Sequence, residues 1–448
     1  MDLHFPKGFL FGAATSAHQV EGGCTNNQWW EWEQTEGNIH DGSTSEVASD
    51  HFNRYREDFE LARDLGMNAQ RISIEWSRIE PEEGVFDEAA LDHYRDVTDT
   101  IRDLGMEPTI TLHHFTNPIW AQRQGGWESP KMVEWLARFS ERAAEALGDR
   151  VRYWFTINEP MIAPALCYAM GIHPPCVRDL GRALPVAKNV LLAHGAMYNA
   201  VKNAVSHVTE VGPVLQMPLI EPLDPDSAAD REAAAQQDWL FNQYYLEGLL
   251  KGVVAPPVGD GAEVPGLARS YDIVGLNYYS RMLVRGGSLE DAQHPAGGAH
   301  DAPSKQAPLL GLRRPHEPSE FQDQMGWEVY PKGLYAQLMR LAPLACPVYV
   351  TESGMATCDE TARSRHLLAH LAQCHRAIRD GLDLRGFFYW TLMDNFEWAE
   401  GYTRTFGLIE IDRDKDLARR PRDAAHLYRD IARGGAVTEE MLARHEVR

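Results

Sequence analysis

Two glutamates stand at positions where acids can do chemistry. Glu159 closes the apolar run 152–160 and is followed by a proline, and Glu352 closes the apolar run 347–352 and is followed by Ser-Gly. Chain breakers after apolar runs indicate strand ends, and parallel strand ends meet at one mouth of a barrel. Two carboxyl groups there can deliver a proton to a leaving oxygen and place an anion beneath an oxocarbenium ion, as glycoside hydrolysis requires. A lone glutamate at a strand end is more often a solvated loop residue, so the pair needs support from its surroundings.

Strand-like apolar runs alternate with amphipathic stretches along the whole chain. Alternation of this kind indicates right-handed βαβ units and a parallel sheet. Eight such units indicate an α/β fold of the closed (β/α)8 TIM barrel type. The predicted strands are 9–17, 69–76, 107–115, 152–160, 209–217, 271–279, 347–352 and 384–392. The predicted helices are 47–66, 88–104, 130–147, 185–205, 229–250, 333–345, 361–380 and 422–433.

The chain is longer than a typical barrel of about 250 residues, so extended βα loops are expected. The clearest is 285–325, which is rich in Gly, Pro and charge and follows the sixth strand. It is predicted to form one wall of a substrate cleft, with a functionless insertion as the alternative. Neither a linker nor an internal repeat divides the sequence, so residues 1–448 are predicted to form a single domain. The tail from 435 is short and polar and carries no signal.

Composition excludes several classes of partner. The chain carries 43 basic and 65 acidic residues, a formal charge of −22, whereas nucleic acids and anionic membranes are bound by basic surfaces. No apolar run approaches the roughly 20 residues that span a bilayer. The apolar start at 9–17 is interpreted as a buried strand and not as a signal peptide. The six cysteines form no Cys-x2-Cys pair and no disulfide framework, which favours reduced thiols and a cytoplasmic location.

Seven short motifs follow one another in the order of a known family. They are FLFGAATSAHQVEG at 9–22, RISIEWSR at 71–78, TLHH at 111–114, TINEP at 156–160, NYYS at 277–280, TESG at 351–354 and WTLMDNFEW at 390–398. Together they strongly resemble glycoside hydrolase family 1, the β-glucosidases and their relatives, from residue 9 to about residue 430. The resemblance implies a retaining β-glycosidase that acts on terminal non-reducing β-D-glycosyl residues, with no metal and no other cofactor.

The resemblance assigns roles to the two glutamates, Glu159 as general acid/base and Glu352 as nucleophile. A retaining pair lies about 5–5.5 Å apart, which strands four and seven can provide across a narrow barrel. Glu159 must be protonated for the first step, and the negative charge of Glu352 is expected to be the chief cause of the raised pKa that this requires. Arg71, Tyr279 and Asn277 are expected to support the nucleophile. For Arg71 a structural ion pair is the alternative.

A hexose site needs polar groups around the rim of the sugar and an aromatic floor. His114 and Trp390 could each be ordinary core residues, but the joint pattern favours a pocket. By resemblance, the substrate-binding residues are Gln19, His114, Asn158, Trp390, Glu397, Trp398 and Phe406. The aglycone side is predicted to be lined by Cys167, Tyr168, His173, Gln216 and Trp327.

Glu397 narrows the range of sugars that the site is expected to bind. Phosphosugar-specific relatives carry Ser at this position, and Lys and Tyr where Arg404 and Phe406 stand. A negative Glu397 is expected to repel a 6-phosphate and to accept hydrogen bonds from the neutral 4- and 6-hydroxyls. The chain also departs from the commonest family pattern at Phe115, where a tryptophan is usual, and this leaves the fine specificity open.

The predicted partners are therefore small β-glycosides and short oligosaccharides, with glucose as the main glycone and galactose or fucose also accepted. A dedicated β-galactosidase or a transglycosylase would use the same two carboxylates and stays as the alternative. A catalytically silent sugar-binding barrel would not need both glutamates. A metal-dependent hydrolase would need a His/Asp cluster at strand ends, which the sequence lacks. The sequence does not indicate an oligomeric state.

Overall fold

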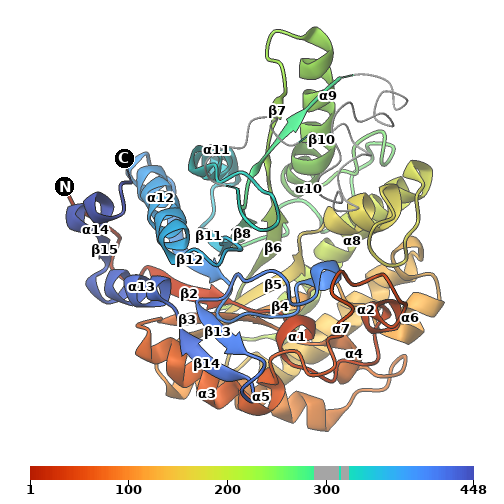
Figure 1. Ribbon diagram of the computed structural model, residues 1–448. Coiled ribbons are helices and arrows are strands. Elements are labelled where there is room, and N and C mark those ends of the chain that lie inside the picture. The colour runs from red at the N-terminus through yellow and green to blue at the C-terminus, as the bar shows by residue number, and fades with distance from the viewer. Residues whose placement is uncertain (287–311, 314–321, 448) are drawn as a thin grey trace.

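Eight parallel strands close into a barrel at the centre of the molecule (Figure 1). The structure, a computed structural model, describes residues 1–286, 312–313 and 322–447. In barrel order from the N-terminus the strands are β2 (Leu10–Ala14), β3 (Ala69–Ser73), β4 (Glu107–His113), β5 (Tyr153–Asn158), β6 (Glu210–Gln216), β8 (Val274–Asn277), β11 (Val348–Ser353) and β12 (Leu384–Trp390). The last strand pairs in parallel with the first, Gly386 opposite Leu10. All eight predicted strands are present, and the (β/α)8 prediction is confirmed.

Helices surround the barrel and follow its strands (Figure 1). They form because apolar residues recur on one face, as in α5, where Leu91, Tyr94 and Ile101 are buried. The Asp87 carboxylate caps this helix by accepting hydrogen bonds from the backbone N–H groups of its first turn. The main helices are α3 (His51–Asp64), α5 (Glu88–Asp103), α7 (Lys131–Leu147), α8 (Leu180–Ala204), α10 (Tyr244–Lys251), α11 (Pro331–Leu341), α12 (Glu360–Arg379) and α13 (Asp423–Gly434).

Two predicted helices differ from the structure. The stretch 229–250 is divided into α9 (Ala228–Asp238), the π-helix η3 (Trp239–Gln243) and α10. The helix predicted at 185–205 begins earlier, at Leu180, because the Asp179 side chain accepts from the N–H groups of Gly181 and Arg182. Pro185 lies inside the helix as its sixth residue, where it cannot donate the backbone hydrogen bond to the residue four positions earlier.

The interior of the barrel is packed and supports the site from below. Its apolar filling is one cluster, which includes Ala69, Phe155, Val214, Tyr349 and Phe388, all buried. A larger cluster lies between the strands and the helices. Because barrel strands point alternate side chains inward, these residues fix the strand ends in place. The functional side chains therefore stand on a rigid base.

Several smaller elements were not predicted. A hairpin of β13 (Ile409–Asp412) and β14 (Ala418–Pro421) follows the last barrel strand. A second sheet joins β7 (Leu219–Pro222), β9 (Arg281–Val284) and β10 (Leu312–Arg313). The tail that carried no signal contains β15 (Ala436–Val437), which pairs with β1 (Leu3–His4), and then α14 (Glu439–Arg444). Short helices are α1 (Ala17–Val20), α2 (Gln28–Glu33), α4 (Trp76–Ile79), α6 (Ile119–Arg123), η1 (Gly126–Glu128), η5 (Ala342–Leu344) and η6 (Trp398–Glu400).

Three further expectations bear on class and location. The predicted cleft wall 285–325 lies mostly outside the described residues. No disulfide joins any of the six cysteines, all of which lie among the described residues. Within the described ranges, no helix combines the length and apolar character needed to cross a membrane.

Candidate active site

Glu159 and Glu352 face one cavity at the mouth of the barrel. Glu159 directly follows β5, and Glu352 is in β11, where it pairs in register with Asn277 of β8. The cavity measures about 350 Å³ and is lined by both carboxyl groups, which is within the range of small-molecule sites. The two side chains are almost fully buried. The structure therefore brings together two acids that are 193 positions apart in sequence, the difference between 352 and 159.

Glu352 receives two short hydrogen bonds, one on each carboxylate oxygen. Arg71 Nη1 lies 2.6 Å from its Oε1, and the Tyr279 hydroxyl lies 2.6 Å from its Oε2. Arg71 is fully buried on β3 and is itself fixed by a 3.0 Å bond from its Nε to Thr111 Oγ1. Burial, and then the charge of Glu352, holds the pKa of Tyr279 well above its ordinary value, so its hydroxyl donates. This setting complements a negative charge on Glu352.

Glu159 has a different environment. It accepts one hydrogen bond, from Asn277 Nδ2 at 2.8 Å. Burial raises the pKa of Glu159 far above that of an ordinary carboxyl, and the nearby charge of Glu352 raises it further. The expectation that Glu352 would be the chief cause is wrong, because loss of solvation is the larger effect in this closed cavity. Glu159 is thus placed to carry a proton near neutral pH.

Asn158 organises the floor between the two acids. Its Oδ1 accepts from Arg71 Nη2 at 2.7 Å and from Asn277 Nδ2 at 3.1 Å, and its Nδ2 donates to His114 Nε2 at 3.2 Å. Burial, together with the Arg71 charge, lowers the pKa of His114 well below its ordinary value, so the ring is neutral. An accepting Nε2 leaves the ring hydrogen on Nδ1. Among the described residues this buried Nδ1 has no partner, and His114 lines the cavity.

Gln19 and Glu397 form the second polar group of the cavity. Gln19 Nε2 lies 3.3 Å from Glu397 Oε2 and 3.1 Å from the Phe396 carbonyl, while its Oε1 accepts from Ser16 Oγ at 2.7 Å. Burial, followed by the charges of Glu352 and Glu400, raises the pKa of Glu397 to about 8. The expectation of a negative Glu397 is therefore corrected. Near neutral pH in the ligand-free site, the protonated form predominates.

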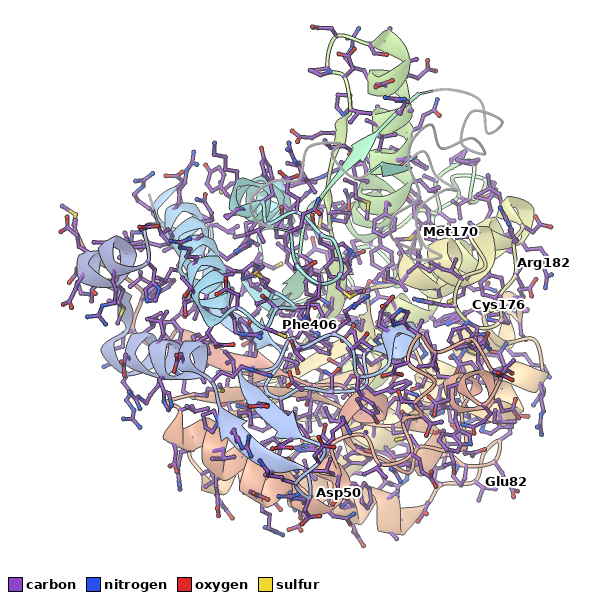
Figure 2. All side chains as sticks on the ribbon, viewed as in Figure 1. Asp50, Glu82, Met170, Cys176, Arg182 and Phe406 are labelled. Carbon is purple, nitrogen blue, oxygen red and sulfur yellow. The ribbon has the colours of Figure 1, made fainter. Side chains whose placement is uncertain are left out.

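Aromatic rings enclose the same end of the cavity. The ring of His114 lies nearly parallel to those of Trp390 and Trp398, with interplanar angles of 17° and 14°. Phe406, near the centre of the view in Figure 2, contacts the rings of Tyr279 and Trp327 at centroid distances of 6.2 and 6.3 Å. All seven predicted substrate-binding residues line this one cavity.

The backbone is strained at three points of the cavity lining. Phe115, Glu159 and Trp398 have φ angles of +70°, +49° and +50°, in the left-handed region that side chains other than glycine seldom adopt. Such residues persist only where the surrounding structure holds them, and they concentrate at functional sites. Here the strain turns the side chains into the cavity at the end of a strand or beside one.

The predicted aglycone side is placed only in part as expected. His173, Gln216 and Trp327 line the cavity. Cys167 and Tyr168 do not, and instead line a small separate cavity behind it, with Trp127 and Val190. Residues Ala163–Ala169 form the π-helix η2, and this small cavity shares Glu159 and His173 with the lining of the larger one.

An apolar wall of the cavity was missed. Aliphatic side chains from η2, α8, β7 and η3 line it, among them Leu166, Leu184, Ile220 and Leu240. Periodicity cannot separate such residues from ordinary core residues, so the sequence carries no signal for them. In the described part of the chain, no group of three or more His, Cys, Asp or Glu side chains could hold a metal ion.

Comparisons with known proteins agree with this geometry. The family model described as Glycosyl hydrolase family 1 matches residues 1–436. The chain is 32% identical to a 1,4-beta-D-glucan glucohydrolase of Thermotoga neapolitana, over 97% of this chain and 99% of that protein. It is 33% identical to a bifunctional beta-D-glucosidase/beta-D-fucosidase of Bifidobacterium breve, over 92% and 95%. The structure resembles a beta-glycosidase from Pyrococcus horikoshii, with a TM-score of 0.88, 37% identity and coverage of 100% and 99%.

Proposed function

The chain belongs to glycosyl hydrolase family 1, and we propose that it hydrolyses terminal β-D-glucosides with retention, with Glu352 as nucleophile and Glu159 as general acid/base. The observation that carries the proposal is the contrast between two carboxyl groups in one cavity. Glu352 is bound by a guanidinium and a hydroxyl, whereas Glu159 is buried with its pKa raised. Two acids whose environments differ in this way suit the two roles.

In the first step Glu352 attacks the anomeric carbon and the bond to the aglycone oxygen breaks. Protonated Glu159 gives its proton to that oxygen, so the aglycone leaves as a neutral alcohol. The glycosyl group is now an ester of Glu352, and the charge that helped to raise the pKa of Glu159 is gone. Glu159 then takes a proton from water, which attacks the ester and releases the sugar with its original configuration.

The polar end of the cavity supports glucose as the glycone. Gln19, His114, Asn158 and Glu397 offer both donors and acceptors around the position of a sugar, and Trp390 offers a flat ring. An unphosphorylated sugar is favoured. Arg404, which follows the Glu397 motif in sequence, pairs with Glu400 at 2.7 Å, so its charge is already engaged and does not attract a phosphate. The bifunctional relative from Bifidobacterium supports β-fucosides as second substrates.

The rest of the proposal concerns setting and substrate range. Six cysteines that form no disulfide with one another support a cytoplasmic location. The glucan glucohydrolase relative supports action on short β-glucan oligosaccharides such as cellobiose. Residues 1–448 are proposed to act as one domain without a metal or another cofactor.

The test is removal of the nucleophile. Glu352→Gly should lower kcat on 4-nitrophenyl β-D-glucoside by at least about 10⁴-fold, because no covalent intermediate can form. Azide should restore part of the activity by filling the space, and the product, read by NMR, should be α-glucosyl azide. Arg444→Gln, a charge removed from an exposed side chain on α14, is the control and should keep full activity. Rescue that yields β-glucosyl azide would contradict the assignment.

A further inference from the structure

Trp398 needs support from other parts of the chain. Its backbone φ of +50° lies in the left-handed region, which costs free energy for a residue with a side chain. Its ring lines the sugar end of the cavity beside the ring of His114. A small displacement of the indole would therefore change how the site fits a sugar. The residues that hold Trp398 bear on binding even where they do not line the cavity themselves.

The ring of His18 stacks on Trp398. The two ring centroids are 5.5 Å apart, and the ring planes are inclined by only 12°. His18 belongs to α1, next to Gln19, but its side chain is 1% exposed and is not part of the cavity lining. Offset stacking of this kind favours one relative orientation of two rings. The orientation of His18 therefore helps to set that of Trp398.

One amide determines which nitrogen of His18 carries the ring hydrogen. Asn27 Oδ1 accepts from the backbone N–H of Trp30 at 2.9 Å, and Asn27 Nδ2 donates to the carbonyl of Cys24 at 3.1 Å. These two bonds fix the orientation of the amide. The same Nδ2 lies 3.2 Å from His18 Nδ1, so this ring nitrogen must accept. The ring hydrogen is therefore on Nε2.

That hydrogen faces a buried carboxylate. Glu33 Oε2 lies 3.6 Å from His18 Nε2, and the exposed fraction of the Glu33 side chain is 0%. Glu33 Oε1 accepts from the N–H and the hydroxyl of Ser45, at 2.9 and 2.8 Å. Neither Glu33 Oε2 nor His18 Nε2 has a hydrogen-bond partner among the described residues. A separation of 3.6 Å is longer than a hydrogen bond, so the contact orients the ring by the attraction between the carboxylate and the N–H dipole.

Helix α2 supplies two supports of Trp398. Trp29 and Glu33 are four residues apart and therefore lie on one face of this helix. Trp29 contacts Trp398 directly, at a centroid distance of 4.6 Å, and Glu33 reaches it through His18. Stability alone does not account for a carboxylate that is buried with one oxygen unbonded, because such burial costs free energy. Departures of this kind are expected at functional sites.

We propose that Glu33 and His18 are positioning residues for Trp398, and that Glu33 acts through the ring of His18 to set the affinity of the cavity for the sugar. The inference rests on the proposed function, because the sugar in question is the glycone of a β-glucoside. Neither residue touches the reacting atoms. Loss of the pair should weaken binding of the sugar in the ground state and the transition state alike, so KM should rise while kcat changes little.

Glu33→Gln tests the proposal with a side chain of the same shape. A glutamine amide has a donor at one end, so it cannot accept both from the Ser45 N–H and from the His18 N–H. The ring of His18 should therefore move. We expect KM for 4-nitrophenyl β-D-glucoside, and Ki for glucose as a competitive inhibitor, to rise about five- to tenfold, with kcat within about twofold. Glu31→Gln is the matched control on the same helix. Glu31 is 50% exposed and pairs with Arg123 at the surface, so both constants should stay unchanged.

A double-mutant cycle separates positioning through His18 from any other role of Glu33. His18→Phe keeps a flat ring beside Trp398 but removes the N–H that faces Glu33. If Glu33 acts through His18, addition of Glu33→Gln to His18→Phe should raise KM by less than about a further twofold. KM and Ki do not depend on the amount of folded enzyme, so partial loss of folded protein in a variant does not affect the comparison.

Three outcomes would overturn the proposal. Unchanged KM and Ki in Glu33→Gln would mean that the carboxylate does not support the sugar site. An equal rise in KM with and without His18→Phe would mean that Glu33 acts by another route, such as its bonds to Ser45. A fall in kcat at constant KM would place the effect on the reacting groups and not on the sugar. Hydrolysis of 4-nitrophenyl β-D-glucoside by the unaltered enzyme tests the proposed function separately, so the two failures are distinct.

Discussion

Asn277 is the side chain that binds the acid Glu159 and joins it to Asn158 and Thr351. Its Nδ2 donates to Glu159 Oε1 and to Asn158 Oδ1, and its Oδ1 accepts from Thr351 Oγ1 at 2.7 Å. Because the N–H group binds the charged form of Glu159, Asn277 lowers the pKa of that carboxyl against the larger effect of burial. Asn277 therefore lowers the pH above which Glu159 loses its proton.

Replacement of Asn277 should move that limit. In Asn277→Ala the bond that stabilises the carboxylate form is lost, so the pKa of Glu159 rises. The alkaline limb of kcat/KM against pH reports the free enzyme, and it should shift upward by roughly one pH unit, which corresponds to about 1.4 kcal/mol. Thr351→Val is the control, since it removes a bond to Asn277 but leaves its N–H group on Glu159. A limb that stays in place, or moves down, in Asn277→Ala would contradict this role.

Sequence identified the polar and aromatic residues of the site but not the aliphatic ones. Glu159, Glu352 and the glycone residues stand in short motifs at strand ends, so their common location follows once the barrel is predicted. Leu166 and Leu240 stand in apolar stretches that are equally consistent with core packing. Cys167 and Tyr168 lie in a small cavity that adjoins the predicted one, a displacement that spacing does not reveal. The raised pKa of Glu397 depends on burial, which is a property of the folded protein.

At the scale of elements, the barrel strands and main helices could be predicted because their periodicity is strong and repeated. The missed elements are short. β1 and β15 have two residues each and form only by pairing with one another, a contact between the two ends of the chain that no local pattern indicates. The close approach of the residue after β11 to the end of β12 is likewise a contact that no local pattern indicates. A Cβ atom on Gly354 would lie 1.8 Å from the Trp390 carbonyl oxygen, so only glycine permits this close approach of two chain segments.

The hairpin β13–β14 is joined to the barrel by a buried ion pair. Arg419 of β14 lies 2.8 Å from Asp58 of α3, and the exposed fractions of the two side chains are 1% and 0%. Burial opposes the charge on Asp58, but hydrogen bonds from His51 and Arg419 outweigh it and lower the pKa of the carboxyl. A carboxyl with a lowered pKa stabilises the fold above its unfolded pKa of about 3.9, and this contribution is lost as the pH falls through the folded pKa.

Removal of Arg419 should leave a charged carboxylate buried with one partner fewer. Arg419→Met is expected to lower the free energy of unfolding by about 3–5 kcal/mol at pH 7, and by less near pH 3, because below about pH 3.9 the unfolded state takes up a proton that the paired carboxylate of the parent does not. Denaturant unfolding at both pH values measures this. The control is Arg420→Met at the next position. Arg420 is 45% exposed and pairs with Asp412 at the surface, so its loss should cost less than about 1 kcal/mol. Equal losses in the two variants would rule out the buried pair as the link.

At the scale of the whole molecule, the buried carboxyl groups of the site lower the free energy of unfolding as the pH rises. Five glutamates, among them Glu159, Glu352 and Glu397, line one cavity in a chain whose formal charge is already −22. For two of them burial raises the pKa above that of an unfolded chain. Between the unfolded and folded pKa values the native state holds a proton that the unfolded state releases. Stability from these groups is therefore complete below about pH 4.5 and is lost progressively as the pH rises through the folded pKa.

Replacement of Glu397 by its neutral isostere should remove part of this loss of stability. The folded pKa of Glu397 is about 8, so the native state loses up to about 1.4 kcal/mol per pH unit between the two pKa values. Glu397→Gln should match the parent enzyme in stability at pH 5 and exceed it by roughly 2–4 kcal/mol at pH 8.5. The variant should lose activity on 4-nitrophenyl β-D-glucoside at both pH values, because a substitution that stabilises a functional site commonly lowers activity. Denaturant unfolding measures the difference, with Glu60→Gln, exposed on α3, as a control that stays within about 0.5 kcal/mol. A gain that is the same at pH 5 and pH 8.5 would mean that titration of Glu397 is not its source.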